Sequence, residues 1–196
     1  MISVSGKKWE QKKINQNLVD KLKQDFNFSD ILSRLIISRK FEVDEIATIN
    51  TDLDLNNVFL NNEDFNQSIK LVVSCIKNNE KICILGDYDV DGASSTAIIV
   101  NFLKNIYSNF FIYIPDRQVD GYGPSVNSLK NIIDKKGEFL ITVDCGTSSF
   151  EALEFASQNN IEVLVIDHHQ AEIKLPKCKA LVNPNQLDDK SNLGYL

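Results

Sequence analysis

Three things that the sequence lacks narrow the class of protein. Its 196 residues contain no run of about 18 apolar residues, so no transmembrane helix and no membrane partner are expected. The first stretch, MISVSGKKWEQKK, has neither an apolar core nor a small-residue cleavage site, which argues against a secretory signal peptide. The four cysteines show no CxxC spacing, so they favour core positions and reduced thiols in a cytoplasmic protein over a disulfide framework or a zinc site.

An excess of positive charge is also lacking. The chain has 21 lysines and arginines against 27 aspartates and glutamates, a net charge of -6, which argues against a generic basic surface for nucleic acid. This balance does not exclude an enzyme that acts on nucleic acid, because bound metal ions can supply positive charge locally. The hydrophobic share of 43% and the charged share of 24% are ordinary for a soluble globular protein.

From about residue 63 the apolar residues follow a regular order. A stretch at 63–80 has helical spacing and is expected to bury one face made of Ile69, Val72, Val73 and Ile76. Five apolar runs then predict strands at 82–85, 110–114, 139–143, 163–166 and 180–182. Helical patterns separate the first four runs, at about 93–107, 125–136 and 148–160. This alternation predicts an α/β fold with a mostly parallel, Rossmann-like sheet of five strands flanked by helices.

The first 60 residues have a different composition. They are rich in asparagine and lysine, and amphipathic pieces occur around DILSRLIISRK and EVDEIATI. The segment INTDLDLNNVF that follows is typical of a linker. We therefore expect a small helical N-terminal segment with a linker at 1–60 and the α/β domain at 61–196.

The unusual polar residues gather where the predicted strands end. In an open α/β sheet, ligands bind outside the carboxyl ends of the strands. The five strands are followed in turn by GDYDVDG, PDRQVDGYG, DCGTSS, DHHQ and NPN. These clusters therefore all fall at the same edge of the predicted sheet, which indicates a shared site.

The side chains in these clusters are suited to divalent cations. If the chain stays extended after the first strand, Asp87, Asp89 and Asp91 point the same way, because side chains in a strand alternate with a period of two. Carboxylates that converge repel one another unless a cation lies between them. A mixed set of carboxylate and imidazole donors suits Mn²⁺ better than it suits Mg²⁺. Further donors that can converge from neighbouring strands are Asp144, His168 and His169.

Each cluster also has a plain structural interpretation. Aspartates beside glycine often form turns or cap helices, and Asp144 taken alone would be a helix cap. Arg117 can serve as an ion-pair partner of Asp116 or Asp120. The DHH triplet, the GYG segment and the NPN segment can each be an ordinary turn.

The segments DYDVDG, VDCG and DHH resemble, in order and spacing, the first three motifs of the DHH phosphoesterase superfamily. Its members include pyrophosphatases, oligoribonucleases, cyclic-dinucleotide phosphodiesterases and RecJ-type single-stranded-DNA exonucleases. The segments GDYDVDGASSTA, YIPDRQVDGYGPS and VNPNQ are most similar to the RecJ type, as is the lead-in ILSRLIISRKFEVDEIATI. The resemblance covers about residues 28 to 196.

The resemblance implies a role for each matching residue. The implied metal ligands are Asp87, Asp89, Asp91, Asp144 and His168, and all of these except Asp87 are also in the implied catalytic set, together with His169. His169 would face the metal or the scissile phosphate, and Asp167 would orient a histidine. The DNA backbone would be held by Arg117, Gly121, Tyr122 and Gly123.

One departure from the RecJ pattern limits what this stretch is expected to do alone. RecJ-type proteins continue for hundreds of residues, with a further metal-binding aspartate and a second domain that closes the cleft. We expect a site for two divalent cations, Mn²⁺ or Mg²⁺. We also expect the domain to be truncated after SNLGYL and one ligand of this site to lie beyond it. Inactivity of the isolated 196 residues is the expected outcome.

The resemblance implies a metal-dependent 5′-to-3′ single-stranded-DNA exonuclease that acts in repair and recombination. The alternatives are an oligoribonuclease or cyclic-dinucleotide phosphodiesterase of the same superfamily and a non-catalytic scaffold that kept the fold. Scaffolds of that kind lose ligand residues, whereas every ligand expected before residue 196 is present here. The sequence identifies no protein partner.

Overall fold

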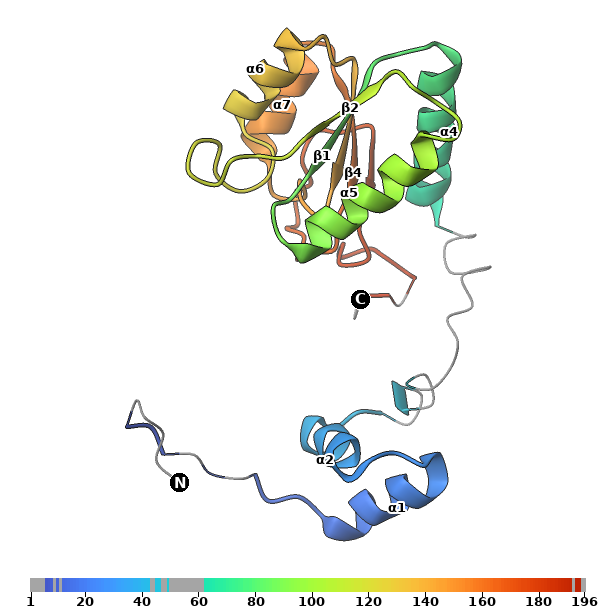
Figure 1. The fold of residues 1–196 in the computed structure, drawn as a ribbon, viewed down its shortest axis with the longest axis vertical. Coiled ribbons are helices and arrows are strands. Elements are labelled where there is room, and N and C mark those ends of the chain that lie inside the picture. The colour runs from blue at the N-terminus through green and yellow to red at the C-terminus, as the bar shows by residue number, and fades with distance from the viewer. Residues whose placement is uncertain are drawn as a thin grey trace. The chain divides into compact units, whose positions relative to one another are not determined.

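The computed structural model describes residues 6–8, 10, 12–42, 45–46, 49, 62–191 and 193–194. Contacts divide the chain into two compact units, residues 1–55 and 56–196. The linker predicted at 49–59 and the boundary predicted at 60/61 fall almost wholly outside the described residues, so both stay predictions. Figure 1 shows the two units.

The N-terminal unit contains a pair of helices joined by a short loop, where the sequence predicts a small helical segment. Helix α1 spans Gln16–Phe26 and helix α2 spans Asp30–Arg39. Asn15 and Ser29 cap them, because each side-chain oxygen accepts a hydrogen bond from a main-chain N–H of the first turn. The pair is held by a small apolar cluster of Leu22, Phe28, Ile36 and Ile46.

The second unit contains a sheet of five parallel strands, which confirms the predicted α/β fold. The strands are β1 (Ile82–Gly86), β2 (Phe110–Tyr113), β3 (Phe139–Val143), β4 (Glu162–Ile166) and β5 (Ala180–Val182). Their order across the sheet is β2-β1-β3-β4-β5. Every residue of β1 and β3 is buried, as expected for central strands covered on both faces.

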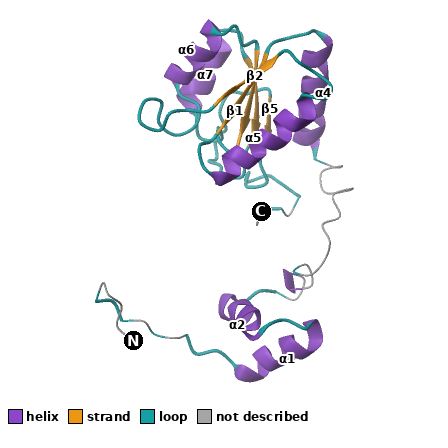
Figure 2. Cartoon of the chain, viewed as in Figure 1, coloured by secondary structure: helices purple, strands orange, loops and turns teal. Residues whose placement is uncertain are grey.

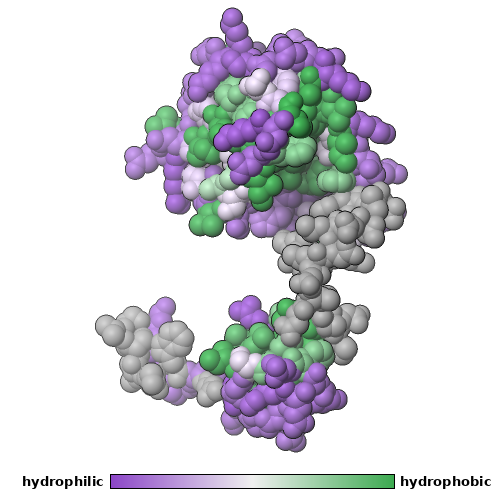
Figure 3. Space-filling model, turned by 45° about the vertical axis from the view of Figure 1, so that its right-hand side comes forward, coloured by the Kyte–Doolittle hydropathy of each residue, from purple (hydrophilic) through white to green (hydrophobic). Residues whose placement is uncertain are grey.

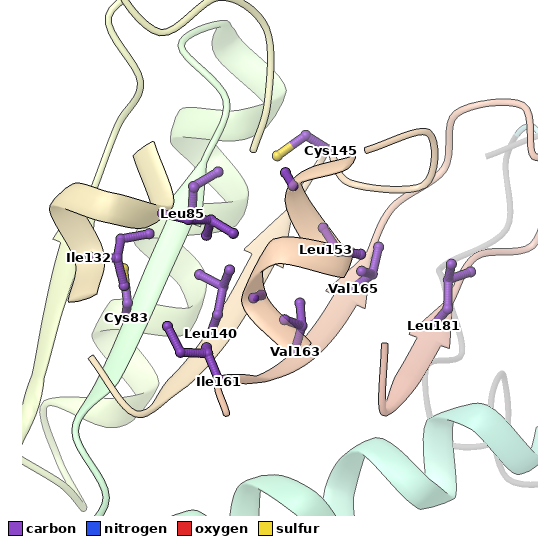
Figure 4. Close-up of a cluster of buried hydrophobic side chains, with 13 residues drawn as sticks. Cys83, Leu85, Ile132, Leu140, Cys145, Leu153, Ile161, Val163, Val165 and Leu181 are labelled. Carbon is purple, nitrogen blue, oxygen red and sulfur yellow. The ribbon is translucent and has the colours of Figure 1, made fainter. Parts of the chain in front are cut away.

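Two helices cover each face of this sheet, and Figure 2 shows the three layers. On one face, α4 (Glu63–Lys77) and α5 (Val90–Leu103) pack on strand residues such as Ile84 and Ile141. On the other, α6 (Val126–Asp134) and α7 (Phe150–Gln158) pack on the alternate strand residues. Figure 4 shows this second cluster, in which Leu85, Leu140 and Val165 of the strands belong to the same core as Leu153 of α7. The strand side chains therefore alternate between two cores.

The apolar face predicted for the stretch at 63–80 is partly wrong. Ile69 and Val73 are 46% and 43% exposed. The helix instead turns Ser68 and Cys75 into the protein, and Phe65 and Leu71 pack on the core beside the predicted Val72 and Ile76. The space-filling view brings the α4 and α5 side forward and shows apolar surface among the polar residues there (Figure 3). The spacing predicted the helix but not its rotation, because apolar residues occur around most of its circumference.

Among the residues that the structure describes, no helix combines the length and apolar character needed to cross a membrane. The four thiols are free, and three of them are buried, as expected for core cysteines.

Candidate metal centre

The sheet has a topological switch point at the carboxyl ends of β1 and β3. The chain leaves β1 toward β2 on one side and leaves β3 toward β4 on the other, so the loops after these neighbouring strands diverge. Gly86 pairs with Val143 in the register of the two strands, which brings the next residues, Asp87 and Asp144, side by side. Ligand atoms of Asp87, Asp89 and Asp144 all lie within 4.8 Å of one another.

A sharp turn between β1 and α5 positions the first two carboxylates. Asp89 is the N-cap of α5, and its Oδ1 accepts a hydrogen bond from the Gly92 main-chain N–H at 2.9 Å. The first turn of the helix lies directly against the end of the strand: a Cβ added at Gly92 would be 2.5 Å from the Asp87 carbonyl oxygen. Glycine is therefore needed at this position because of the close approach of two backbones.

The expectation that three aspartates line up along an extended chain is wrong. Helix α5 begins at Val90, so Asp91 lies in its first helical turn and is exposed. Asp91 is not in either group of converging donor atoms found among the described residues. The local reason is the capping side chain of Asp89, which starts the helix before the third aspartate. The role of Asp91 as a ligand stays a prediction.

Asp144 is the central residue of the cluster. It follows β3 in a left-handed conformation, with φ of 61°, and its N–H donates to the Ile166 carbonyl at 2.9 Å. Its side chain is buried, and its Oδ2 has no hydrogen-bond partner among the described residues. Burial is the main cause that raises the pKa of this carboxyl group, and the charge of Asp89 is the second. A divalent cation would satisfy the unpartnered oxygen and offset the repulsion, so these residues fit a metal.

The two histidines complete a second group of donors. His168 Nε2 lies 3.0 Å from Asp144 Oδ1, and atoms of Asp144, His168 and His169 lie within 4.8 Å of one another. Asp144 thus belongs to both groups. His169 Nδ1 is 2.7 Å from Asp167 Oδ1, and this hydrogen bond is the main cause that raises the pKa of His169.

Asp167 lies behind the histidines and is 6% exposed. Its Oδ1 accepts hydrogen bonds from the main-chain N–H groups of His168 and His169, at 2.8 and 3.2 Å. Its Oδ2 accepts one from the Thr147 N–H at 2.9 Å. Burial by itself would raise the pKa of Asp167, but the hydrogen bonds from Thr147 and His169 outweigh it and lower the pKa. The carboxylate is therefore held ionised beside the imidazole.

Sequence reasoning missed Asn183 and Thr147, which support this loop. Asn183 is 2% exposed, and its Nδ2 donates to Thr147 Oγ1 at 2.9 Å and to the His169 carbonyl at 2.8 Å. Asn185 Nδ2 in turn donates to the His168 carbonyl. The signal was present in the sequence, since NPN follows β5 at the same sheet edge, but an ordinary turn had been an equally good interpretation.

The loop after β2 brings Tyr122 to the histidines. Tyr122 Oη lies 3.2 Å from His169 Nε2, and the two rings meet edge to face. Gly121 and Gly123, on either side, have φ of 83° and 65°, values that allow the tight turn. A pocket of about 510 Å³ opens beside His169 and Asp167, with Tyr122, Pro124 and Phe150 among its lining residues.

Arg117 lies in the same loop and is exposed. Its guanidinium carbon is 5.3 Å from the centre of the Tyr88 ring. In the part of the chain that the structure describes, no ion pair joins it to Asp116 or Asp120, so the simple ion-pair interpretation gains no support from the structure.

Comparison with known families agrees with this geometry. The family model described as "DHH family, N-terminal domain" matches residues 81–195, which is more than half of the chain. The chain belongs to the DHH family. This membership confirms the resemblance drawn from the DYDVDG, VDCG and DHH segments.

Within the DHH family, the chain is similar to exonucleases of the RecJ type. The RecJ single-stranded-DNA-specific exonuclease of Bacillus subtilis is 29% identical over 185 residues, which cover 93% of this chain and 23% of that protein. The Haemophilus influenzae enzyme of the same name is 41% identical over 120 residues, or 61% of this chain and 21% of that protein. The chain thus spans less than a quarter of the length of these relatives.

Solved structures show the same fold. A crystal structure of exonuclease RecJ bound to manganese matches with a TM-score of 0.59 and 28% identity, over 65% of this chain and 32% of that one. RecJ from Thermus thermophilus, in complex with Mn²⁺, matches with a TM-score of 0.60 over 90% of this chain and 24% of that one. Its identity of 22% supports the fold alone.

Proposed function

We propose that this DHH-family chain carries the site of a metal-dependent phosphodiesterase, with Mn²⁺ or Mg²⁺ as the cofactor. The observation that supports this most is the position of Asp144. Its carboxylate belongs to both groups of converging donors, is buried, and has one oxygen without a partner among the described residues. Two groups that share a carboxylate are the arrangement expected for a pair of divalent cations.

The donor set favours manganese over magnesium. One group is made of three carboxylates, whereas the other combines Asp144 with two imidazoles. Imidazole suits transition metals, and carboxylate suits Mg²⁺ and Mn²⁺ alike, so Mn²⁺ is the ion that satisfies both groups. The matching RecJ crystal structures are described as bound to manganese, which is consistent with this assignment.

The proposed ligands are Asp87, Asp89, Asp144 and His168, with Asp91 retained on the strength of its motif alone. When bound, the cations would lower the pKa of water and neutralise charge on a phosphate. Asp167 holds His169 at the edge of the pocket by their 2.7 Å hydrogen bond. His169 and Tyr122 would then contact the substrate, and no side chain of the protein need act as nucleophile.

We further propose single-stranded DNA as the substrate, cleaved in the 5′-to-3′ direction in repair and recombination. The support is the similarity to relatives named single-stranded-DNA-specific exonucleases. Arg117 and the turn at Gly121, Tyr122 and Gly123 would hold the DNA backbone beside the histidines. The free thiols fit a reducing compartment, and the cytoplasm is the proposed location.

Calorimetric titration with Mn²⁺ tests the metal centre. The wild-type chain is compared with a variant that carries both Asp89→Ala and Asp144→Ala, and with Asp134→Ala as a control, since Asp134 is an exposed residue at the end of α6. We expect binding by the wild type and the control and none by the double variant. Equal binding by all three folded proteins would contradict the proposal.

Product analysis tests the substrate. The chain, and a RecJ-type protein that contains it, are incubated with Mn²⁺ and either single-stranded DNA or dinucleotides. We expect the longer protein to release mononucleotides from the 5′ end of DNA and the isolated chain to release little or none. Cleavage of dinucleotides alone would instead favour an oligoribonuclease or cyclic-dinucleotide phosphodiesterase, and metal binding without any cleavage by the longer protein would favour a scaffold.

A further inference from the structure

The charge around the metal centre makes Arg117 unusual. The loops that follow β1, β2 and β3, at 87–89, 114–125 and 144–149, contain five aspartates and, as their one lysine or arginine, Arg117. A phosphate-bearing strand that approaches the ends of β1, β2 and β3 therefore meets one permanently charged cation in these three loops, whereas the loop after β4 has lysines at 174, 177 and 179. The position of Arg117 relative to the carboxylates decides whether it can contact a phosphate at the same time as the metal centre does.

The acidic residues nearest to Arg117 in sequence are engaged elsewhere. Asp120 accepts hydrogen bonds from the Tyr113 hydroxyl at 2.9 Å and from Asn127 Nδ2 at 2.8 Å. Asp116 Oδ1 accepts one from the Gln118 N–H at 2.8 Å. These bonds shape the loop but do not hold the guanidinium of Arg117. An exposed arginine without such a restraint would sample many rotamers, and ordering it on substrate binding would cost free energy.

The partner that restrains it is Tyr88. The guanidinium carbon of Arg117 lies 5.3 Å from the centre of the half-buried Tyr88 ring, within the range of a cation–π contact. Tyr88 is the residue between Asp87 and Asp89, and its N–H donates to Asp87 Oδ1 at 2.7 Å. The ring thus extends from the backbone that presents the carboxylates.

We propose that Tyr88 is a positioning residue: its ring holds the Arg117 guanidinium at the edge of the carboxylate cluster, ready to contact a phosphate of the bound strand. The inference rests on the proposed function, because it needs a phosphodiester substrate. The ring face is the part that matters, since a planar guanidinium stacks on it and keeps its N–H groups free for phosphate oxygens. The hydroxyl is not required.

The contact itself is tested by NMR, independently of any substrate. The chain has only three arginines, Arg34, Arg39 and Arg117, so spectra of protein labelled with carbon-13 arginine contain few signals. The ring current of Tyr88 should shift the Arg117 side-chain signals upfield in the wild type and in Tyr88→Phe. In Tyr88→Leu they should return to the ordinary arginine position, while the Arg34 signals stay unchanged.

The contribution of the Tyr88–Arg117 contact to substrate binding is tested by measuring the affinity for a fluorescent oligothymidylate with Mn²⁺ present. Tyr88→Leu should weaken binding by about two- to fivefold and Tyr88→Phe should not, the range expected for an exposed cation–π pair. In an Arg117→Ala background, Tyr88→Leu should have no further effect, because the ring acts only through the arginine. Affinity for Mn²⁺, measured by calorimetry, should be the same in all the Tyr88 variants.

The outcomes separate this inference from the proposed function. Unchanged Arg117 signals in Tyr88→Leu, or unchanged oligothymidylate binding by that variant, would overturn the positioning role and leave the metal-dependent function standing. Loss of Mn²⁺ affinity in Tyr88→Leu would assign the ring to the carboxylate cluster and overturn it as well. If the wild-type chain bound no oligothymidylate, the proposed function would fail, and the positioning role with it.

Discussion

Asn183 Nδ2 donates a hydrogen bond to the main-chain carbonyl of His169 at 2.8 Å, and so connects the end of β5 to the histidine pair. The same amide donates to Thr147 Oγ1, while Asn183 Oδ1 accepts from the Asn185 N–H at 2.8 Å. Since Asn183 is buried, each of these groups would be left without a partner if the side chain were shortened. The loop that carries the proposed ligand His168 therefore depends on a residue outside the metal centre.

Replacing this amide should weaken both the fold and the metal centre. We expect Asn183→Ala to lower the free energy of unfolding by about 1–3 kcal/mol, because buried polar groups lose their partners. Its affinity for Mn²⁺ should also fall, because the His169 carbonyl is no longer held. Urea denaturation and calorimetric titration measure the two effects.

The matched control for this variant is Asn105→Ala. Asn105 is exposed after α5, and its Nδ2 donates only to the nearby Asn101 carbonyl. Its replacement should leave both measurements close to wild type. If Asn183→Ala behaved in the same way, the network would not be what orders the histidines.

The strands could be predicted because their cause is local. Each is a short, continuous apolar run, and the observed bounds of β3 and β5 are those predicted from the sequence. The convergence of Asp87 with Asp144 could be expected too, because carboxyl ends of parallel strands meet at one edge. The fold and the location of the site are thus available from periodicity and motif position.

The details that the sequence did not indicate depend on distant partners or on where a helix begins. Asp91 was expected to point the same way as Asp89, but Asp89 caps α5, which begins at the next residue, Val90, and so contains Asp91. Asn183 and Thr147 are 36 residues apart in the chain and meet only when β3, β4 and β5 are assembled. Such contacts have no period and no spacing from which to read them.

The turn from β1 into α5 should not tolerate a side chain at Gly92. The added methyl group of Gly92→Ala would lie 2.5 Å from the Asp87 carbonyl oxygen, so backbone must move. We expect the free energy of unfolding to fall by about 1–3 kcal/mol, as in other overpacked sites. Because the movement displaces Asp87 and Asp89, Mn²⁺ affinity should fall as well, and calorimetry measures it.

Ser94→Ala is the corresponding control in the same helix, since Ser94 is exposed. It should unfold at a urea concentration close to that of the wild type and bind Mn²⁺ equally well. A Gly92→Ala protein with wild-type stability would mean that the two backbones are not in the close contact described.

The thiols should react slowly in the folded protein. Burial is the main cause that raises the pKa of each thiol. The pKa is about 11 for Cys178 and about 12 for Cys75 and Cys83, and that of Cys145 is raised as well. The thiolate is the reactive form, and near pH 8 it should make up only about a thousandth of Cys178 or less. A disulfide exchange reagent should therefore label the native chain slowly and all four thiols rapidly in denaturant.

An engineered Ser94→Cys provides the reference rate for this measurement. Its thiol would be exposed on α5 and should react with the reagent at the rate of a cysteine in an unfolded peptide. If Cys178 in the folded wild type reacted as fast, its thiol would not be protected by the packing around it, and the raised pKa would be wrong.

Asp144→Asn should separate the two effects of this residue on stability. Without metal, Asp144 raises the free energy of the folded state, since its carboxylate is buried beside the charge of Asp89. The neutral amide removes that repulsion, so the variant should be more stable than the wild type in the presence of a chelator. Thermal unfolding under these conditions measures the difference.

Adding Mn²⁺ should reverse the order of the two proteins. A ligand that binds only the folded state stabilises it by about 2.7 kcal/mol at a hundred times its dissociation constant. The wild type should gain this stability, whereas Asp144→Asn should gain little, because the donor shared by both groups is weakened. Asp134→Asn, which changes the same charge at an exposed site, should respond to Mn²⁺ as the wild type does. Equal gains in stability in all three proteins would show that the cation binds elsewhere. If Mn²⁺ instead makes the wild type and Asp134→Asn more stable than Asp144→Asn, the bound cation is what makes the buried charge of Asp144 tolerable.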